Sequence, residues 1–301
     1  MKIKLLISVW LVTLSVHAAI VPVLMTTSSL PDIRDIPADL VIPPLTDGPP
    51  AAGTRVKHFL LEYQGTQIYH VLYLPTDWHP GMRYPVIVEY AGNGGFTNKY
   101  TDLSTGRPEN SQLGYGVSSG KGFIWLCLPF VDVNTKKIAV HWWGDVDATV
   151  AYCKKAVQMV CAEFGGDPAS VILSGFSRGA IACGYIGLHD DEIAGLWRAF
   201  IPYSHYDGVR RWPYPGSDAP AAIARMQRLR SRPSFVCQET SVAETQKYIE
   251  ASGIRAPFRF QVVPFHNHND GWILRPSSAR TALRKWLQEV LSSKLSANTL
   301  L

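Results

Sequence analysis

The sequence predicts an α/β fold with a mostly parallel central sheet and helices on both of its faces. Short apolar stretches, such as residues 86–90 and 199–203, alternate with longer stretches of helical periodicity. Parallel strands are buried on both faces, so they form continuous apolar runs and not alternating patterns. The folded domain is also expected to begin with a hairpin-like pair of strands at residues 56–63 and 67–74, joined near Gly65. We therefore expect two opening strands followed by parallel strands and crossover helices.

The remaining elements follow from apolar periodicity and from signals that start or end helices. Residues 145–164 carry apolar side chains at spacings of three and four, and the two glycines that follow end this predicted helix. Ser241 and Glu244 have the spacing of a capping box at the start of a helix that ends near Ala251. We further expect strands at residues 123–130, 170–174, 234–237 and 258–264, and helices at residues 180–188, 219–229 and 277–291.

The N-terminal part of the chain is expected to lie outside the folded domain. Lys2 and Lys4 precede a short apolar run, and the small residues before Ala19 match a signal-peptide cleavage site. The run is shorter than the roughly 20 residues needed to span a bilayer. Residues 1–18 are therefore predicted to be a signal peptide, residues 19–54 a proline-rich surface extension and 55–301 the folded domain. We expect a secreted or periplasmic protein with no membrane span in the mature chain.

Charge and cysteine content exclude two classes of function. The net charge of +5 is spread along 301 residues, and no basic block with interleaved aromatic residues predicts nucleic-acid binding. The five cysteines are an odd number, and their spacing resembles no zinc site. We expect most of them to be buried thiols that pack as small apolar side chains. The sequence leaves the oligomeric state open.

The most informative motif is the pattern G-x-S-x-G at residues 175–179. A predicted strand precedes it, and a predicted helix rich in small side chains follows it. A serine on a sharp strand-to-helix turn is lifted clear of the sheet, and the flanking glycines relieve the crowding of the backbone. Ser177 is therefore the candidate nucleophile. The alternative is an ordinary strand-to-helix turn in which Ser177 only caps the helix.

The order of these features resembles the α/β-hydrolase superfamily of serine esterases and related peptidases. The resemblance covers residue 56 to the C-terminus. It rests on the motif at residues 175–179, the glycine-rich loop at 92–95 and the histidine-containing loop at 265–272. It implies the α/β-hydrolase fold and acyl transfer by a serine, an acid and a histidine that follow one another in this order. It implies neither a cofactor nor a metal.

The resemblance places the histidine after the last core strand and the acid after an earlier one. His268 is the expected base, and His266 in the same loop is the alternative. Glu239 is the expected acid because it ends the penultimate predicted strand. Asp207, which follows the strand at residues 199–203, is the alternative acid. Either carboxylate could instead only fix a loop or cap a helix.

The oxyanion hole needs two backbone N–H groups that point at the developing negative charge. One donor is expected from Arg178, the residue after the nucleophile. The other is expected from Asn93 or Gly94, in the glycine-rich loop after the strand at residues 86–90. This loop resembles the His-Gly-Gly-Gly loop of esterases, although it lacks the histidine.

Three aromatic residues, Trp143, Tyr206 and Trp272, lie on loops at the expected active-site end of the sheet. They could stack on a sugar or an aromatic acyl group, or they could pack in the interior. The Arg178 side chain is a candidate to meet an anionic substrate group. The sequence thus predicts a secreted serine hydrolase that cleaves carboxylic esters of a small molecule or a glycan. The alternatives are a serine peptidase of the prolyl-oligopeptidase type and an inactive hydrolase-fold binding protein.

Overall fold

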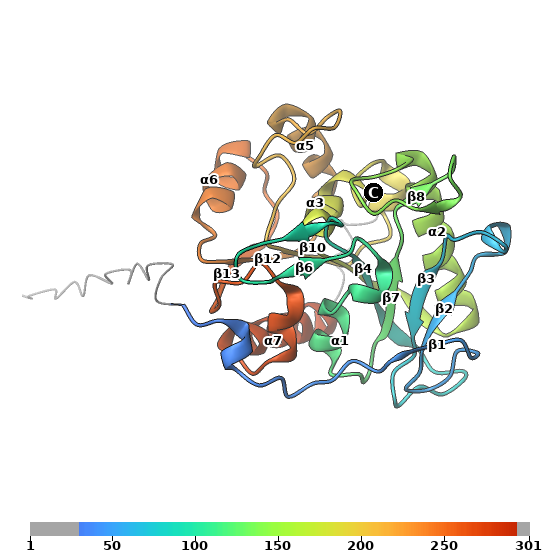
Figure 1. The fold of residues 1–301 in the computed structure, drawn as a ribbon. Helices are drawn as coiled ribbons and strands as arrows, with labels where there is room; N and C mark the ends of the chain where they lie inside the picture. The colour runs from blue at the N-terminus through green and yellow to red at the C-terminus, as the bar shows by residue number, and fades with distance from the viewer. Residues whose placement is uncertain (1–29, 294–301) are drawn as a thin grey trace, which may run out of the picture.

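The computed structural model describes residues 30–293, so the predicted signal peptide lies outside the described residues. The main sheet has nine strands in the order β1-β2-β3-β7-β4-β10-β11-β12-β13 (Figure 1). The strands are β1 (Leu45–Thr46), β2 (Arg55–His58), β3 (His70–Tyr73), β4 (Tyr84–Tyr90), β7 (Ile124–Leu128), β10 (Gly166–Phe176), β11 (Ala199–Tyr203), β12 (Ser234–Glu239) and β13 (Phe258–Val263). Two small sheets pair β5 (Phe96–Thr97) with β6 (Leu103–Ser104) and β8 (Val131–Asp132) with β9 (Lys137–Ile138).

Strand β3 runs antiparallel to both of its neighbours, β2 and β7. All the other neighbouring strands of the main sheet pair in parallel. The predicted hairpin start and the parallel sheet that follows are therefore confirmed.

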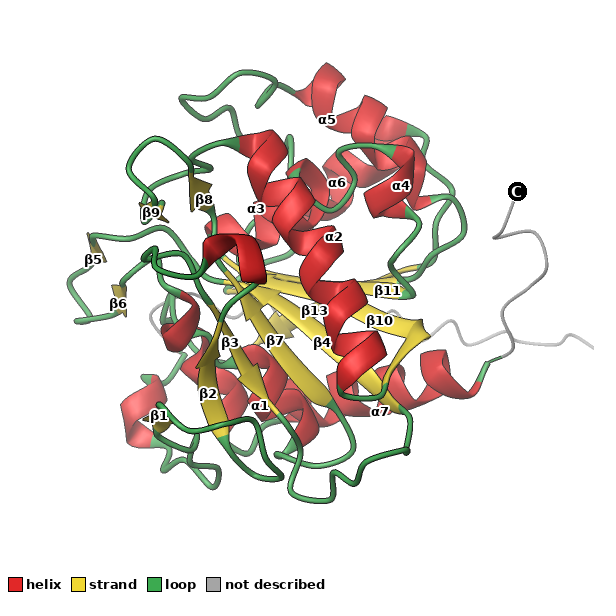
Figure 2. Cartoon of the chain, turned by 90° about the vertical axis from the view of Figure 1, so that its right-hand side faces the viewer, coloured by secondary structure: helices red, strands yellow, loops and turns green. Residues whose placement is uncertain are grey.

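Helices lie on both faces of the sheet, as predicted. In Figure 2, α1 and α7 lie on one side of the sheet, and α2 to α6 lie on the other. The α-helices are α1 (Leu113–Ser118), α2 (Val146–Glu163), α3 (Arg178–Tyr185), α4 (Asp191–Ala194), α5 (Ala219–Met226), α6 (Ala243–Ser252) and α7 (Ser278–Ser292). Short 3₁₀ helices occur at η2 (Ile33–Asp35), η3 (Leu61–Tyr63), η4 (Pro108–Asn110), η5 (Gln227–Leu229) and η6 (Asp270–Leu274).

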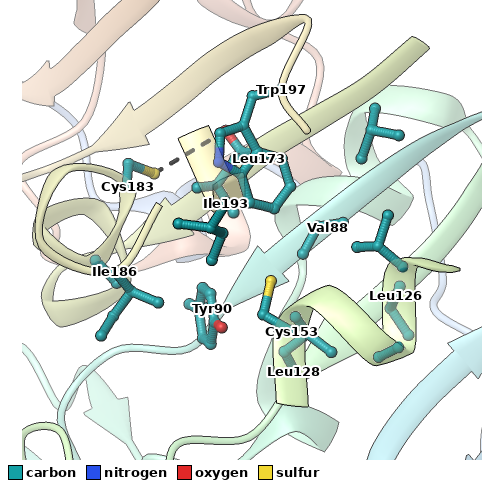
Figure 3. Close-up of a cluster of buried hydrophobic side chains, with 14 of the residues drawn as sticks. Val88, Tyr90, Leu126, Leu128, Cys153, Leu173, Cys183, Ile186, Ile193 and Trp197 are labelled. Atoms are coloured by element: carbon teal, nitrogen blue, oxygen red, sulfur yellow. Dashed lines mark hydrogen bonds between the residues drawn. The ribbon is translucent and has the colours of Figure 1, made fainter. Parts of the chain in front are cut away.

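Alternate residues of the central strands point into two separate apolar cores. Val88 and Tyr90 of β4 pack with residues of α2 and α3, such as Cys153 (Figure 3). Ile87, the residue before Val88, packs in the core under α1 and α7 together with Trp286. Because successive side chains of a strand point to opposite faces, an uninterrupted apolar run fills both cores at once. The central strands are apolar for this reason.

The predicted capping box at the start of α6 is wrong. The residue at the N-cap position is Val242, one residue later than the box requires. Glu244 therefore lies in the first turn, and its carboxylate pairs with Arg210 at 3.4 Å. The Ser241 hydroxyl accepts a hydrogen bond from the Ala243 N–H at 3.2 Å. A left-handed residue at Thr240 (φ 63°) turns the chain before the helix and sets this start.

Part of the proline-rich extension belongs to the folded body. Its strand β1 pairs in parallel with β2 at the edge of the main sheet. Further along the chain, all five cysteines are free thiols, and only Cys161 is not fully buried. The thiols thus act as apolar side chains.

A buried carboxylate on β4 organises the start of α1. Glu89 accepts hydrogen bonds from the N–H groups of Gln112, Leu113 and Gly114 at 2.8–3.1 Å, and from the Trp125 indole at 2.8 Å. The first N–H groups of a helix have no partner within the helix, and a carboxylate satisfies them well. Burial raises the pKa of Glu89, and these four donors oppose the rise.

We predict that Glu89→Gln lowers the free energy of unfolding by about 2 kcal/mol, the usual scale for a charge-assisted hydrogen bond. All four contacts of the carboxylate are donors, so the amide NH₂ of glutamine must face at least one N–H group. Urea unfolding followed by circular dichroism measures the loss. Glu289→Gln, on the exposed side of α7, is the control and should change stability by less than about 0.5 kcal/mol. Equal stability of the two variants would contradict the assigned role of Glu89.

Candidate active site

Ser177 occupies a strained turn between β10 and α3. Its backbone is left-handed (φ 54°, ψ −111°), which is unusual for a residue with a side chain. A Cβ atom at Gly175 would collide with the backbone of Gly179, and one at Gly179 would collide with the Tyr90 carbonyl. The glycines of the motif are therefore required by the close approach of the turn, the helix and β4.

The loop after β13 brings His268 to this serine. The Nε2 atom of His268 lies 3.0 Å from the Oγ atom of Ser177. On the other side of the ring, Nδ1 lies 2.8 Å from Oε1 of Glu239, the last residue of β12. The structure thus joins Ser177, His268 and Glu239 in one continuous chain of hydrogen bonds.

A second serine, which the sequence analysis missed, completes this arrangement. Ser204 directly follows β11 and has a left-handed backbone (φ 83°). Its hydroxyl donates to Oε1 of Glu239 at 2.8 Å and also lies 2.8 Å from Nδ1 of His268. Burial alone would raise the pKa of Glu239, but the hydrogen bond and charge of His268, with help from Ser204, lower it. The position of Ser204 at a strand end on the active-site edge was the available signal in the sequence.

The two alternative residues lie elsewhere. Asp207 is buried and forms a two-point ion pair with Arg225, at 2.9 and 3.1 Å. Burial raises the pKa of Asp207 to about 6, against the opposing effect of Arg225. His266 turns its Nδ1 atom to the Leu30 carbonyl at 2.9 Å, away from Ser177. Neither residue contributes to the chain of hydrogen bonds at Ser177.

Two of the three backbone N–H groups expected to form the oxyanion hole have no acceptor in the described part of the chain. Among residues 30–293, the N–H groups of Arg178 and Asn93 donate to no acceptor. The N–H of Gly94, which the sequence analysis also offered as a donor, is already bonded to the Val140 carbonyl at 2.7 Å. Gly94 thus fixes its loop to the segment before Trp142, and the Asn93 side chain does the same by accepting from the Trp142 N–H at 2.8 Å.

The Arg178 side chain does not reach the substrate side, contrary to the expectation from sequence. Its guanidinium is buried and donates to the carbonyls of Trp142 (2.6 Å), Ala139 (3.2 Å) and Gly106 (3.2 Å). The group also lies 4.0 Å from the centre of the Phe130 ring. Burial lowers its pKa to about 9, so it stays charged at neutral pH. Arg178 therefore ties the loops around the motif to the start of α3.

Two of the three aromatic residues predicted to bind substrate are core residues. Trp143 is buried and stacks on Tyr185, with ring centres 4.7 Å apart. Trp272 is fully buried and packs against Tyr203. These rings are covered by segments that are distant in sequence, which loop position alone does not reveal. Tyr206, itself largely buried, borders a pocket.

This pocket, of about 430 Å³, opens beside His268 and Glu239. Most of its lining is polar, and its apolar side includes the partly exposed rings of Phe96 and Trp212. Burial lowers the pKa of His205, which also lines the pocket, to about 4. Its remaining lining residues are Ser204, Tyr206, Val209, Arg210, Gln238, Thr240, Ser241, Glu244 and Thr245.

The described chain offers no obvious site for a metal. Within residues 30–293, no group of three or more His, Cys, Asp or Glu side chains is arranged to hold an ion. Across the same residues, none of the helices combines the length and apolar character that crossing a membrane requires.

Comparison with known proteins identifies the fold. No family model and no curated protein matches the sequence. An AtxE2 isopeptidase with Astexin3-dC4 bound matches at 12% identity and a TM-score of 0.52, over 81% of this chain and 41% of the isopeptidase. The sugar hydrolase YeeB of Lactococcus lactis matches at 13% identity and a TM-score of 0.52, over 79% of this chain and 98% of that protein. The chain has the α/β-hydrolase fold. The resemblance inferred from the sequence is thus confirmed at the level of the fold, although the chain spans less than half of the isopeptidase.

We predict that Ser204→Ala lowers kcat by about ten- to a hundredfold and leaves KM within twofold. The hydroxyl contacts both members of the Glu239–His268 pair, and losing a hydrogen bond to a charged group costs about 1.5–3 kcal/mol. Steady-state kinetics on a chromogenic ester measures both constants. Ser292→Ala, at an exposed position at the end of α7, is the matched control. An unchanged kcat in Ser204→Ala would show that the Ser204 hydroxyl does not contribute to catalysis.

Proposed function

We propose that this protein is a secreted serine hydrolase that cleaves carboxylic esters through an acyl-enzyme. One observation carries the proposal: Ser177, His268 and Glu239 form a continuous hydrogen-bonded chain. The backbone N–H of Arg178, the residue after Ser177, has no acceptor among the described residues. A serine hydroxyl needs a base in contact with it and an acid to orient that base, and this geometry supplies both.

In the proposed reaction, Ser177 Oγ attacks the ester carbonyl carbon while Nε2 of His268 takes its proton. The carbonyl oxygen becomes negatively charged, and the N–H groups of Arg178 and Asn93 are the proposed donors to it. When the tetrahedral intermediate collapses, the C–O bond to the alcohol breaks and His268 returns the proton to the leaving oxygen. Water then attacks the acyl-enzyme by the same route in reverse, and Glu239 stabilises the charged imidazole in both halves.

The pocket beside His268 favours a polar alcohol as the leaving group. The leaving oxygen must lie next to His268, so the alcohol extends towards the pocket that this residue lines. The hydroxyls of Thr240 and Ser241 can hydrogen-bond a sugar, and the partly exposed rings of Phe96 and Trp212 can pack against its apolar face. Together with the predicted secretion, this supports an acyl group on a polysaccharide as the substrate.

A peptidase of the prolyl-oligopeptidase type is the second candidate, because an isopeptidase shares the fold. A panel of short p-nitrophenyl esters, acetylated and feruloylated glycans and dipeptide amides separates the two activities. Hydrolysis of the acetylated or feruloylated glycans without hydrolysis of the dipeptide amides supports the esterase. Hydrolysis of the dipeptide amides but not of the glycan esters supports the peptidase. An inactive binding protein would hydrolyse none of these substrates and would not react with a fluorophosphonate.

Ser177→Ala and His268→Ala should each lower kcat by about four to six orders of magnitude. The nucleophile and its base act as a unit, so the double variant should lose no more than either single one. Ester turnover and fluorophosphonate labelling measure the effect, and circular dichroism checks that the fold is retained. His266→Ala is the matched histidine control and should be far milder. Retention of more than a few per cent of wild-type turnover in Ser177→Ala would exclude Ser177 as the nucleophile.

The two carboxylates should respond differently to removal of their charge. Glu239→Gln should lower kcat by up to about four orders of magnitude with a small change in stability, because the acid orients and stabilises the imidazole. Asp207→Asn should nearly preserve kcat and lower stability by about 3 kcal/mol, because it leaves Arg225 buried without its partner. Steady-state kinetics measures kcat and urea unfolding measures the stability of both variants. Together they show which carboxylate acts as the acid. A loss of kcat confined to Asp207→Asn would reverse the assignment.

A further inference from the structure

The loop that carries His268 is held by a buried carboxylate outside the chain of catalytic contacts. One oxygen of Asp102 accepts the backbone N–H of His268 at 3.1 Å. Its other oxygen accepts the side-chain amides of Asn267 at 3.0 Å and Asn269 at 3.3 Å. One side chain therefore contacts three successive residues of the loop, with the base in the middle.

Asp102 is itself fixed in place. The side-chain NH₂ of Asn98 donates to the Asp102 carboxylate at 2.9 Å, and the side-chain Oδ1 of Asn98 accepts the Asp102 backbone N–H at 3.1 Å. The left-handed residue Thr101 (φ 59°) turns the chain between them. Only 2% of the Asp102 surface is exposed, so its four hydrogen bonds are shielded from water.

The N-terminal extension holds the same loop from the opposite direction. The Ile33 N–H donates to the side-chain oxygen of Asn267 at 2.8 Å, and the contact is buried. The Pro31 carbonyl accepts the His266 N–H at 3.3 Å. Asn267, which is fully buried, thus joins Asp102 on one side to the extension on the other.

The extension is in turn anchored to the body of the domain. The Asp39 carboxylate pairs with Arg280 of α7 at 2.6 Å, and the Arg275 side chain donates to the Ile36 carbonyl at 2.9 Å. Figure 1 shows this first segment, in dark blue, passing alongside α7. The contacts at Ile33 and Pro31 therefore come from a segment that is fixed at its far end.

We propose that Asp102 and residues 30–36, together called the loop clamp, position His268 for catalysis. This inference rests on the proposed function. Neither part of the clamp lies in the Ser177–His268–Glu239 chain, so both act through the residues of the loop that carries His268. A displacement of a reacting group by about 1 Å can cost a hundredfold in rate. Loss of the clamp should therefore lower kcat and leave KM nearly unchanged.

Asp102→Asn tests the carboxylate. All four of its partners are N–H donors, so an amide at this position must place its NH₂ group against at least one of them. We expect turnover per active serine to fall about ten- to a hundredfold, with KM within twofold. The matched control is Asp47→Asn, an exposed carboxylate of the same extension, which should behave as wild type.

Titration with a fluorophosphonate distinguishes positioning from a purely structural role. A purely structural defect lowers the fraction of molecules whose serine can be labelled. It leaves the turnover number, calculated per serine counted by the titration, at the wild-type value. That result would overturn the proposal for Asp102. A variant in which all serines can be labelled, but whose turnover number per titrated serine is low, supports the positioning role of Asp102.

A pair of variants at Ile33 tests the extension separately, and it applies even where Asp102→Asn does not fold. Ile33→Ala and Ile33→Pro both lose the buried side chain, but only proline also loses the N–H that donates to Asn267. Ile33 is the first residue of η2, where proline is tolerated, and Asp32 before it is already extended (φ −75°, ψ 142°). We expect turnover per labelled serine about fivefold lower in Ile33→Pro than in Ile33→Ala. Equal values would exclude a positioning role for the hydrogen bond from the Ile33 N–H to Asn267.

The outcome for the clamp can be separated from the outcome for the proposed function. A wild-type protein that reacts with the fluorophosphonate but hydrolyses no ester would contradict ester specificity alone. The rate constant for labelling of Ser177 then replaces turnover as the readout, because labelling needs the nucleophile and the base but no particular substrate. A wild-type protein that is not labelled would contradict the proposed function, and the clamp with it.

Discussion

The candidate site depends on the parallel pairing of four neighbouring strands, β10 to β13. Parallel strands end at the same edge of a sheet, so residues that follow successive strands meet there. Ser177 follows β10, Ser204 follows β11, Glu239 ends β12 and His268 lies in the loop after β13. Each strand thus delivers one polar side chain to a single cluster. A change in strand order or register would disperse groups that are up to 91 residues apart in sequence.

Two buried charges hold the irregular segments around this edge. Arg178 donates to three carbonyls of the loops at residues 106 and 139–142, and Glu89 accepts from the first N–H groups of α1. In both cases a charged side chain satisfies main-chain groups that have no partner in a helix or sheet. Such groups are costly when buried alone, so each charge orders the backbone around it. Because Arg178 directly follows Ser177, the same contacts hold the motif and its flanking loops as one unit.

The histidine loop is different, since its supports come from outside the central strands. Asp102 belongs to the segment between β4 and α1, and Ile33 belongs to the N-terminal extension. A long loop after an outer strand has few partners within the sheet, and side chains from distant segments supply them. The extension therefore contributes to the site as well as to the sheet edge at β1.

Much of the fold and part of the site could be predicted from sequence, because their signals are local. Strand burial shows as an apolar run, and the helix α2 shows as a period of three to four residues. The strained turn at Ser177 requires its neighbouring glycines, so a short motif pointed to Ser177 as the candidate nucleophile. The order of elements then pointed to the loop of His268.

Tertiary structure decided the questions that depend on distance. Glu239 and Asp207 both follow strand ends, and only packing shows that Arg225 pairs with Asp207 while His268 faces Glu239. Ser204 carries no motif of its own, and its role arises from two contacts with residues far along the chain. Trp143 and Trp272 appeared available on loops, yet other segments bury them. A local pattern constrains the backbone of a segment, whereas burial, ion pairing and free hydrogen-bond donors depend on which distant segments pack against it.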